Sequence, residues 1–316
     1  MAVYTEVPSS ALEQFVREYD IGKIVYFKGI EEGVENSNFL LKTNRDTYIL
    51  TIYEKRVDSV DLPFFLGLMN HLANKGFPCP TPLHGFDGKA LRTLCNKPAA
   101  LITFVTGSGP KIITRDHCYS VGKIAGKMHT AAKDFRMSRN NTLDRLGWRK
   151  LFELTKERAN DFYEGIVEEI ESELNFLDQN WPRRLPVGII HADLFPDNVF
   201  FKKKTLSGVI DFYFACNGFM AYEIATCINA WCFENDGGLN SGKVSSLLEG
   251  YKSIRTLEEA ELRSLLLLAR GSALRFLLTR LYDLLNHSKG ALVKPKDPLE
   301  YLERLRYHKE SDKNLC

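Results

Sequence analysis

The stretch "GIIHADLFPDNVFF" at residues 188–201 places short polar side chains between two apolar runs. Within it, Asp193 and Asn198 lie five residues apart, and Pro196 stiffens the loop between them. Transfer of a γ-phosphoryl group requires a carboxylate near the acceptor hydroxyl and hard oxygen ligands for Mg²⁺. Asp193 could accept the hydroxyl proton, and the amide oxygen of Asn198 could bind the metal. The spacing therefore predicts a phosphoryl-transfer site.

A second carboxylate follows at a distance that a hairpin can bring back to this loop. The segment 199–212, "VFFKKKTLSGVIDF", is typical of two short strands joined by a turn. It places Asp211 18 residues after Asp193, about right for such a hairpin, so Asp211 is the predicted second metal ligand. A polar loop of this kind could also be a capped turn without chemistry, because Asp and Asn favour turns. The combination with Asp211 favours function.

The part of the chain before this loop is typical of a small antiparallel sheet with helices. Apolar spacing predicts a helix from residue 9 or 10 to Tyr19 and another over residues 60–75. β-Branched and aromatic residues predict strands at 23–30, 37–43, 47–54, 89–95 and 99–105. We therefore expect a first lobe over residues 1–105, which ends before the glycine-rich "TGSGP" segment at 106–110. In the outline of a two-lobed kinase, this lobe would bind the nucleotide.

The rest of the chain, residues 106–316, is expected to form a larger and mainly α-helical lobe for catalysis and substrate binding. A strand-like interruption appears only at residues 187–211. Helical periodicity covers 114–133, 148–180, 220–233 and 257–287. The predicted fold class is α+β, with the two-lobed outline of the protein kinases.

Composition favours a small-molecule partner. The 316 residues carry 42 basic and 40 acidic side chains, and the net charge of +2 indicates neither nucleic acid nor an anionic membrane as a partner. The seven cysteines are irregularly spaced, which is typical of reduced thiols in a cytoplasmic protein. We find no export signal or bilayer-spanning run. A monomer and a homodimer are both compatible with the sequence.

The HxDxxxxN motif and the following I-D-F resemble the catalytic loop and metal-binding aspartate of the aminoglycoside phosphotransferase and choline kinase superfamily, relatives of the protein kinases. The segments "EEGVENSNFLL", "DLPFFLGLMNHLANKG" and "IDFYFACNGFMAYEIATCINAWCFE" are similar to bacterial homoserine kinases of this fold. The similarity extends over nearly the whole chain. It implies ATP and Mg²⁺ as cofactors, and L-homoserine as the acceptor of the phosphoryl group on its side-chain hydroxyl.

The resemblance also implies roles for individual residues. His191 should orient the catalytic loop by hydrogen bonding rather than take part in the chemistry. The segment 29–41 should cover the nucleotide phosphates, and the main chain after the fifth strand should bind adenine. The nucleotide-binding residues expected on this basis are Gly33, Asn36, Ser37, Asn38, Thr51, Thr103 and Val105.

One position departs from the wider superfamily. The third strand normally carries a lysine that pairs with the α/β-phosphates and with a glutamate of the next helix. Thr51 occupies that place here, and the helix offers Asp58 or Asp61. Lys55 lies four residues further on, about 13 Å along an extended strand, and is a poor substitute. Lys42 on the adjacent strand is no better supported, so the cation that meets the phosphates stays open at this point.

A free amino acid presents a carboxylate and an ammonium group, so its pocket should contain an arginine and an acidic partner. Arg270, Arg275 and Arg280 lie within the predicted C-terminal helix, and Asn229 belongs to a polar group soon after the metal aspartate. These residues could also form a solvated helix face with core aromatics. The expected acceptor-binding residues are Asn217, Tyr222, Glu223, Trp231 and Arg275.

Two alternatives remain at this point. The same chemistry could act on another hydroxyl compound, such as an aminoglycoside, choline, a methylthio-sugar or a ketosamine. Choline would require an aromatic cage, and an aminoglycoside a strongly acidic pocket. The chain could instead be a catalytically inactive nucleotide-binding regulator. The missing strand lysine is the only support for that reading, and Asp193, Asn198 and Asp211 argue against it.

Overall fold

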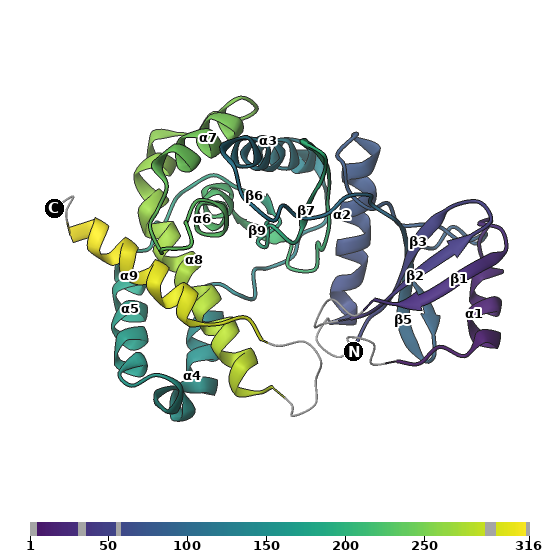
Figure 1. Cartoon of the computed structure of the whole chain (residues 1–316), viewed down its shortest axis with the longest axis horizontal. Coiled ribbons are helices and arrows are strands. Elements are labelled where there is room, and N and C mark those ends of the chain that lie inside the picture. Colours follow the sequence, from purple (N-terminus) through teal and green to yellow (C-terminus); the bar gives the residue numbers. More distant parts are fainter. Residues whose placement is uncertain (1–4, 31–35, 55–57, 288–294, 314–316) are drawn as a thin grey trace.

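The computed structural model describes residues 5–30, 36–54, 58–287 and 295–313. A β-sheet with two helices lies at one end, beside a larger and mainly helical part (Figure 1). This architecture confirms the predicted α+β fold class. The predicted lobe boundary at residues 105 and 106 stays a prediction.

Five strands form one antiparallel sheet in the order β1-β2-β3-β5-β4. Each of them falls within a segment predicted from β-branched and aromatic residues, apart from two residues at the start of β5. The strands are β1 (Ile24–Gly29), β2 (Ser37–Thr43), β3 (Thr47–Ile52), β4 (Arg92–Leu94) and β5 (Lys97–Thr103).

The two faces of the sheet belong to different parts of the hydrophobic core, because successive side chains of a strand point to opposite faces. Leu50 of β3 packs with α1 (Ser9–Val16) in a small cluster on one face. Ala100 of β5, on the other face, belongs to the large cluster that also contains α2 (Leu62–Asn74) and the helical part. Figure 1 shows α2 between the sheet and the helices.

Helix α2 follows the short 3₁₀ helix η1 (Ser59–Asp61) and lies between the sheet and the helical part (Figure 1). Phe65 of α2 makes an edge contact with the ring of Tyr213, with centroids 5.6 Å apart. The helix ends before Gly76, whose φ of +74° is the left-handed conformation expected of a C-terminal glycine. The aromatic contact fixes this helix against the segment that follows Asp211.

The helical part contains two helices that the periodicity did not predict. Helices α7 and α9 were missed because one is rich in Ser and Gly and the other is strongly polar. The single helix expected at 148–180 is two helices, separated near Gly165 with its φ of +80°. The elements are α3 (Arg115–Ala131), η2 (Ala132–Asp134), α4 (Arg145–Phe162), α5 (Ile166–Asn180), α6 (Met220–Trp231), α7 (Ser241–Lys252), α8 (Glu259–Leu285) and α9 (Leu299–Lys313). Within the described residues, no helix combines the length and apolarity needed to cross a bilayer.

Four short strands surround the polar loop of the helical part. β7 (Val199–Lys202) and β8 (Thr205–Val209) form the hairpin that the sequence predicts. β6 (Val187–Ile190) pairs instead with β9 (Cys216–Phe219), a strand that was not predicted. The four residues of β9 include Asn and Gly, which give a weak strand signal. The pairing of β6 with β9 brings the segments before and after the hairpin together.

Candidate active site

The polar loop at residues 191–198 is the predicted catalytic loop and is called so below. It connects β6 to β7 and is folded onto itself by local hydrogen bonds. The Asn198 side-chain amide donates to the Asp193 carboxylate and to the Asp193 carbonyl, both at 2.9 Å. The Phe195 N–H donates to the Asp193 carbonyl at 2.8 Å, and the Asn198 N–H donates to the Phe195 carbonyl at 3.0 Å. Because the Asn198 Nδ2 is committed to Asp193, the Oδ1 oxygen is the atom that Asn198 can offer to a cation.

The hairpin returns Asp211 to this loop through its neighbour Ile210. The Ile210 N–H donates to the Asn198 carbonyl at 2.9 Å, and the Ile210 carbonyl lies 3.0 Å from His191 Nε2. Asp211 itself is exposed and has a φ of +63°, which is uncommon for a residue with a side chain. Main-chain contacts therefore hold Asp211 beside Asn198 in an unusual backbone conformation.

Asp193 is partly buried at the base of the loop. Burial raises the pKa of its carboxyl group, and the nearby charges of Arg275 and Lys296 oppose this rise. A carboxylate with a raised pKa is a better proton acceptor for a hydroxyl group than an ordinary surface aspartate. Its electrostatics thus fit the role that the sequence predicts.

His191 is fully buried and lies against the ring of Phe212, with ring centroids 4.8 Å apart. Burial lowers the pKa of its imidazole to about 4, so the ring is neutral near pH 7. A neutral imidazole can donate through Nε2 to the Ile210 carbonyl at 3.0 Å. His191 thus links the catalytic loop to the hairpin, which supports an orienting role.

Ala192 precedes Asp193 and has a φ of +64°, a strained conformation for a residue with a Cβ atom. Polar side chains form hydrogen bonds to both its N–H and its carbonyl group. Its N–H donates to both carboxylate oxygens of Glu223 at 3.2 Å, and its carbonyl accepts a hydrogen bond from Arg275. Glu223 also accepts from the His191 N–H. Glu223 and Arg275 therefore stabilise the loop in its strained form.

Three of the residues expected to line the acceptor pocket lie instead beneath the catalytic loop. Glu223 and Trp231 are 0% exposed and Arg275 is 2% exposed. The Trp231 indole N–H donates to the Leu194 carbonyl at 2.6 Å, so all three side chains bond to the loop backbone. Their burial favours a role in positioning this loop, and their contact with an acceptor stays a prediction.

The other two expected acceptor residues also make contacts within the protein. Tyr222 is buried, with its ring centroid 6.1 Å from that of Trp181. The side-chain oxygen of Asn217 accepts from the Arg139 N–H at 2.9 Å, and the Asn217 N–H donates to the Arg139 carbonyl at 2.8 Å. Asn217 remains partly exposed, so its contact with an acceptor stays a prediction.

The buried carboxyl of Glu223 predicts a pH dependence of stability. Burial raises its pKa from 4.5 to about 7. Between these values the unfolded chain loses this proton while the folded protein keeps it, so the free energy of unfolding falls as pH rises, by about 3 kcal/mol. Glu223→Gln should lack this contribution. Urea unfolding of both proteins from pH 4.5 to 8 measures the difference, and parallel stability curves would contradict the prediction.

The side chains at the predicted phosphate-binding turn are bonded to Glu54, which follows β3. The Asn36 side-chain oxygen accepts from the Glu54 N–H at 3.3 Å, and the Ser37 hydroxyl donates to the Glu54 carboxylate at 2.7 Å. Gly33 lies outside the described residues. Coverage of the phosphates by this turn stays a prediction, and it would use main-chain N–H groups because these side chains anchor the turn.

Uncharged side chains surround Thr51, at the position of the missing strand lysine. Thr51 is buried and donates to the Asn38 side-chain oxygen at 2.8 Å. On the same face of the sheet, the Tyr53 and Tyr213 hydroxyl oxygens lie 3.2 Å apart. Lys55 lies outside the described residues. Uncharged, hydrogen-bonded side chains thus fill the place of the strand lysine, and the cation that meets the phosphates stays open.

Asp61, one of the two acidic candidates on the helix, pairs with an arginine that the sequence did not single out. Its carboxylate lies 2.5 Å from Arg139 Nε. Arg139 also donates to the Ala215 carbonyl at 3.3 Å and lies over the ring of Phe65. The segment around Arg139 has no helical or strand periodicity, so no sequence signal placed it beside the site.

Of the two residues predicted to bind adenine, Thr103 already uses its N–H and hydroxyl groups within the protein. The Thr103 N–H donates to the Thr81 carbonyl at 3.0 Å, and the Thr103 hydroxyl oxygen accepts from the Thr81 N–H at 2.9 Å. The Thr103 main-chain donor is therefore already used. Val105 is partly buried, and a Cβ placed on Gly208 would lie only 2.5 Å from its Cγ1 atom. Binding of adenine by the Val105 main chain stays a prediction.

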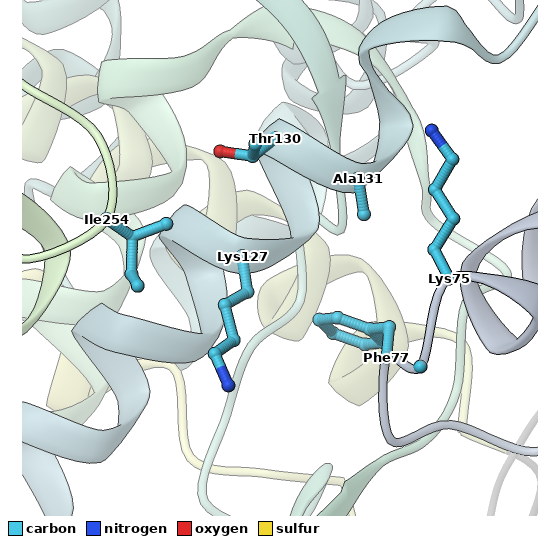
Figure 2. Close-up of a pocket in the computed structure, with 7 residues that line it drawn as sticks. Lys75, Phe77, Lys127, Thr130, Ala131 and Ile254 are labelled. Atoms are coloured by element: carbon cyan, nitrogen blue, oxygen red, sulfur yellow. The ribbon is translucent and has the colours of Figure 1, made fainter.

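A separate cavity of about 430 Å³ lies between the end of α2 and α3. Figure 2 shows the Phe77 ring between Lys75 and Lys127 at this cavity. None of the predicted site residues lines it. It is thus distinct from the catalytic loop.

The described residues contain no group of three or more His, Cys, Asp or Glu side chains placed to hold a metal. The predicted metal site consists of one carboxylate, Asp211, and one amide oxygen, Asn198. Mg²⁺ is commonly bound by one or two protein groups together with substrate phosphates and water. The residues present fit this kind of site, in which the nucleotide supplies the remaining ligands.

Comparison with known proteins identifies the class to which this fold and site belong. The model of the phosphotransferase enzyme family matches residues 27–257. The chain therefore belongs to the phosphotransferase enzyme family and, within it, to the homoserine kinases. The homoserine kinase of Paramagnetospirillum magneticum is 55% identical over 314 residues, which cover 98% of this chain and 96% of the relative. That of Parvibaculum lavamentivorans is 54% identical over 309 residues, with 98% and 96% coverage.

Solved structures show the same fold at much lower sequence identity. The amicoumacin kinase hAmiN, solved in complex with AMP-PNP, Ca²⁺ and Ami, gives a TM-score of 0.69 at 14% identity and covers 96% of this chain and 93% of its own. Spectinomycin phosphotransferase, solved with ADP and spectinomycin, gives 0.68 at 14% identity, with 97% and 95% coverage. These similarities support the fold.

Proposed function

We propose that this protein transfers the γ-phosphoryl group of ATP to the side-chain hydroxyl of L-homoserine, giving O-phospho-L-homoserine and ADP. The observation that carries this function is 55% identity to a homoserine kinase over 98% of the chain. The catalytic loop supports it, because Asp193 and Asn198 are both present and hydrogen-bonded to each other at 2.9 Å. This function belongs to the biosynthesis of threonine.

In the proposed reaction, Asp193 orients the acceptor hydroxyl and accepts its proton. The hydroxyl oxygen forms a bond to the γ-phosphorus while the bond from phosphorus to the β–γ bridging oxygen breaks, and ADP leaves with that electron pair. The raised pKa of Asp193 favours proton transfer. Glu223 and Arg275 hold the preceding residue, Ala192, and so keep Asp193 in position.

Asn198 and Asp211 would hold Mg²⁺ through one amide oxygen and one carboxylate. When bound, this cation neutralises phosphate charge and aligns the phosphoryl group with the acceptor. The fit is supported by the Asn198 Nδ2 atom, which donates to Asp193 and so leaves the Oδ1 oxygen for the metal. The hydrogen bond from the Ile210 N–H to the Asn198 carbonyl keeps the two ligands close together.

The remaining features of the proposal concern partners and location. The partners are ATP and a small-molecule acceptor, with neither nucleic acid nor membrane. The nearly equal numbers of basic and acidic residues, 42 and 40, support this. We place the protein in the cytoplasm, as a monomer or homodimer. The cysteines described, all of them free thiols, support a reducing compartment.

A coupled ADP-release assay over a panel of acceptors tests the function. L-Homoserine should give a kcat/KM about 10³-fold or more above those of kanamycin, choline and methylthioribose, because a site that binds polar groups rejects compounds lacking them. Preference for another member of the panel would overturn the acceptor assignment. Binding of ATP without turnover of any acceptor would identify a non-catalytic regulator instead.

A further inference from the structure

An exposed ion pair joins the catalytic loop to the segment before α9. Lys296, in the segment between α8 and α9, places its Nζ atom 2.6 Å from the Asp197 carboxylate. Both side chains are 57% exposed, although they are in direct contact. The Lys296 ammonium also lies 5.4 Å from the centroid of the Phe195 ring, within the same loop. Two opposite and accessible charges therefore meet at the catalytic loop, one from Asp197 of the loop and one from Lys296 of the segment before α9.

The position of Lys296 is fixed by its neighbours. The carbonyl of the next residue, Asp297, accepts from the Arg280 guanidinium at 2.9 Å, and Glu300 lies 2.5 Å from the same group. At the start of α9, the buried ring of Tyr301 lies 6.2 Å from that of Phe195, centroid to centroid. The segment that carries Lys296 is thus anchored to α8 and packed against the catalytic loop.

The arginines predicted as candidates for binding a carboxylate ligand already pair with other groups of the protein. Arg270 pairs with the buried Glu173 at 2.7 Å, and Arg280 holds the segment of Lys296. Arg275 donates to the Ala192 carbonyl beneath the loop. All three arginines are buried. In contrast to these arginines, Lys296 combines an exposed side chain with direct contact to the catalytic loop, through Asp197 and the Phe195 ring.

We propose that Lys296 binds the α-carboxylate of the acceptor and that Asp197 binds its α-ammonium group. This inference rests on the proposed function and extends it to the recognition of a free amino acid. In L-homoserine, three single bonds separate the hydroxyl oxygen from the α-carbon, a reach of roughly 4 Å. Asp193 and Asp197 belong to one tight loop, closed by the hydrogen bond from the Phe195 N–H to the Asp193 carbonyl. The hydroxyl and the charged groups of one small molecule can thus meet the same loop.

Binding exchanges one set of ion pairs for another without a change in net charge. The bond between Lys296 and Asp197 opens, and each residue then meets the opposite charge of the zwitterionic acceptor. An exposed ion pair contributes little to stability by itself, so opening it costs little free energy. A compound that lacks either charge leaves one residue without its new partner. The pair thus selects acceptors that carry both a carboxylate and an ammonium group.

Two truncated acceptors separate the two contacts. 3-Amino-1-propanol lacks the carboxylate, and 4-hydroxybutanoate lacks the ammonium group. Lys296→Met should raise the KM for L-homoserine about 10- to 100-fold, the loss expected for one charge-assisted hydrogen bond. Its kcat/KM for 3-amino-1-propanol and its KM for ATP should stay within about threefold of the wild-type values, since no carboxylate contact is lost there. Asp197→Asn should show the reverse selectivity and lose its discrimination against 4-hydroxybutanoate.

Lys156→Met provides a matched control, because Lys156 is an exposed lysine paired with Glu153 on α4. It should leave all these constants unchanged. Equal losses on L-homoserine and 3-amino-1-propanol in Lys296→Met would overturn the carboxylate assignment. A raised KM for ATP in that variant would assign Lys296 to the nucleotide instead. If the wild-type protein fails to phosphorylate L-homoserine, the proposed function fails, whereas an active wild type with unchanged variants contradicts this inference alone.

Discussion

Replacing Asp193 by asparagine should lower kcat for L-homoserine by about 10³-fold, because the variant loses the group that accepts the hydroxyl proton. The asparagine side chain has the same shape and retains an oxygen that can accept the hydrogen bond from Asn198, found here at 2.9 Å. The loop should therefore keep its fold. The dissociation constant of ATP should stay within about threefold of the wild-type value, since Asp193 is not proposed to contact the nucleotide.

A coupled ADP-release assay measures kcat, and calorimetric titration measures ATP affinity in the same preparations. Asp161→Asn serves as the control, because Asp161 is an exposed aspartate on α4. This control should retain full activity. Wild-type turnover in Asp193→Asn would remove the proton-acceptor assignment. Loss of ATP binding together with turnover would instead indicate that the substitution unfolds the loop.

Replacing Asp211 by alanine should weaken the binding of ATP in the presence of Mg²⁺ by about 100-fold. The carboxylate of Asp211 is the only charged protein ligand in the proposed metal site, and metal coordination of this kind contributes several kcal/mol. The exposure of Asp211 makes a large loss of folding stability unexpected. Calorimetric titration of ATP into both proteins measures the effect.

Removal of Mg²⁺ gives the decisive comparison for this variant. With EDTA present, wild type and Asp211→Ala should bind ATP with similar affinity, because the metal-dependent contribution is then absent from both. Asp161→Ala should behave as wild type under both conditions. A difference in affinity between wild type and Asp211→Ala that persists without the metal would show that Asp211 acts on the nucleotide by another route.

The catalytic loop and hairpin could be predicted because their signals are local. Asp193, Asn198 and Asp211 lie within 19 consecutive residues, and the turn chemistry and strand patterns of that segment determine how they return to one another. Strand pairing between distant segments was harder to predict from the sequence. The pairing of β6 with β9 joins residues about 30 positions apart, and the four residues of β9 carry little strand propensity.

The acceptor side could not be predicted to the same degree, because its residues come from several distant elements. Arg275 and Glu223 were identified by charge, but charge alone does not show whether a side chain faces a pocket or a loop backbone. In the structure both side chains form hydrogen bonds to the backbone of Ala192. Arg139 and Lys296 lie in segments without periodicity, and tertiary packing alone brings them to the site.

The convergence of Asp193, Asn198 and Asp211 around a divalent cation is tested most directly by a crystal structure with a non-hydrolysable ATP analogue and Mn²⁺ in place of Mg²⁺. The anomalous difference map should place Mn²⁺ about 2.1 Å from Asn198 Oδ1 and an Asp211 carboxylate oxygen. Asp193 should stay outside the coordination shell and face the acceptor side. A cation bound elsewhere, or bound by the nucleotide without Asn198 and Asp211, would contradict the assignment of the site.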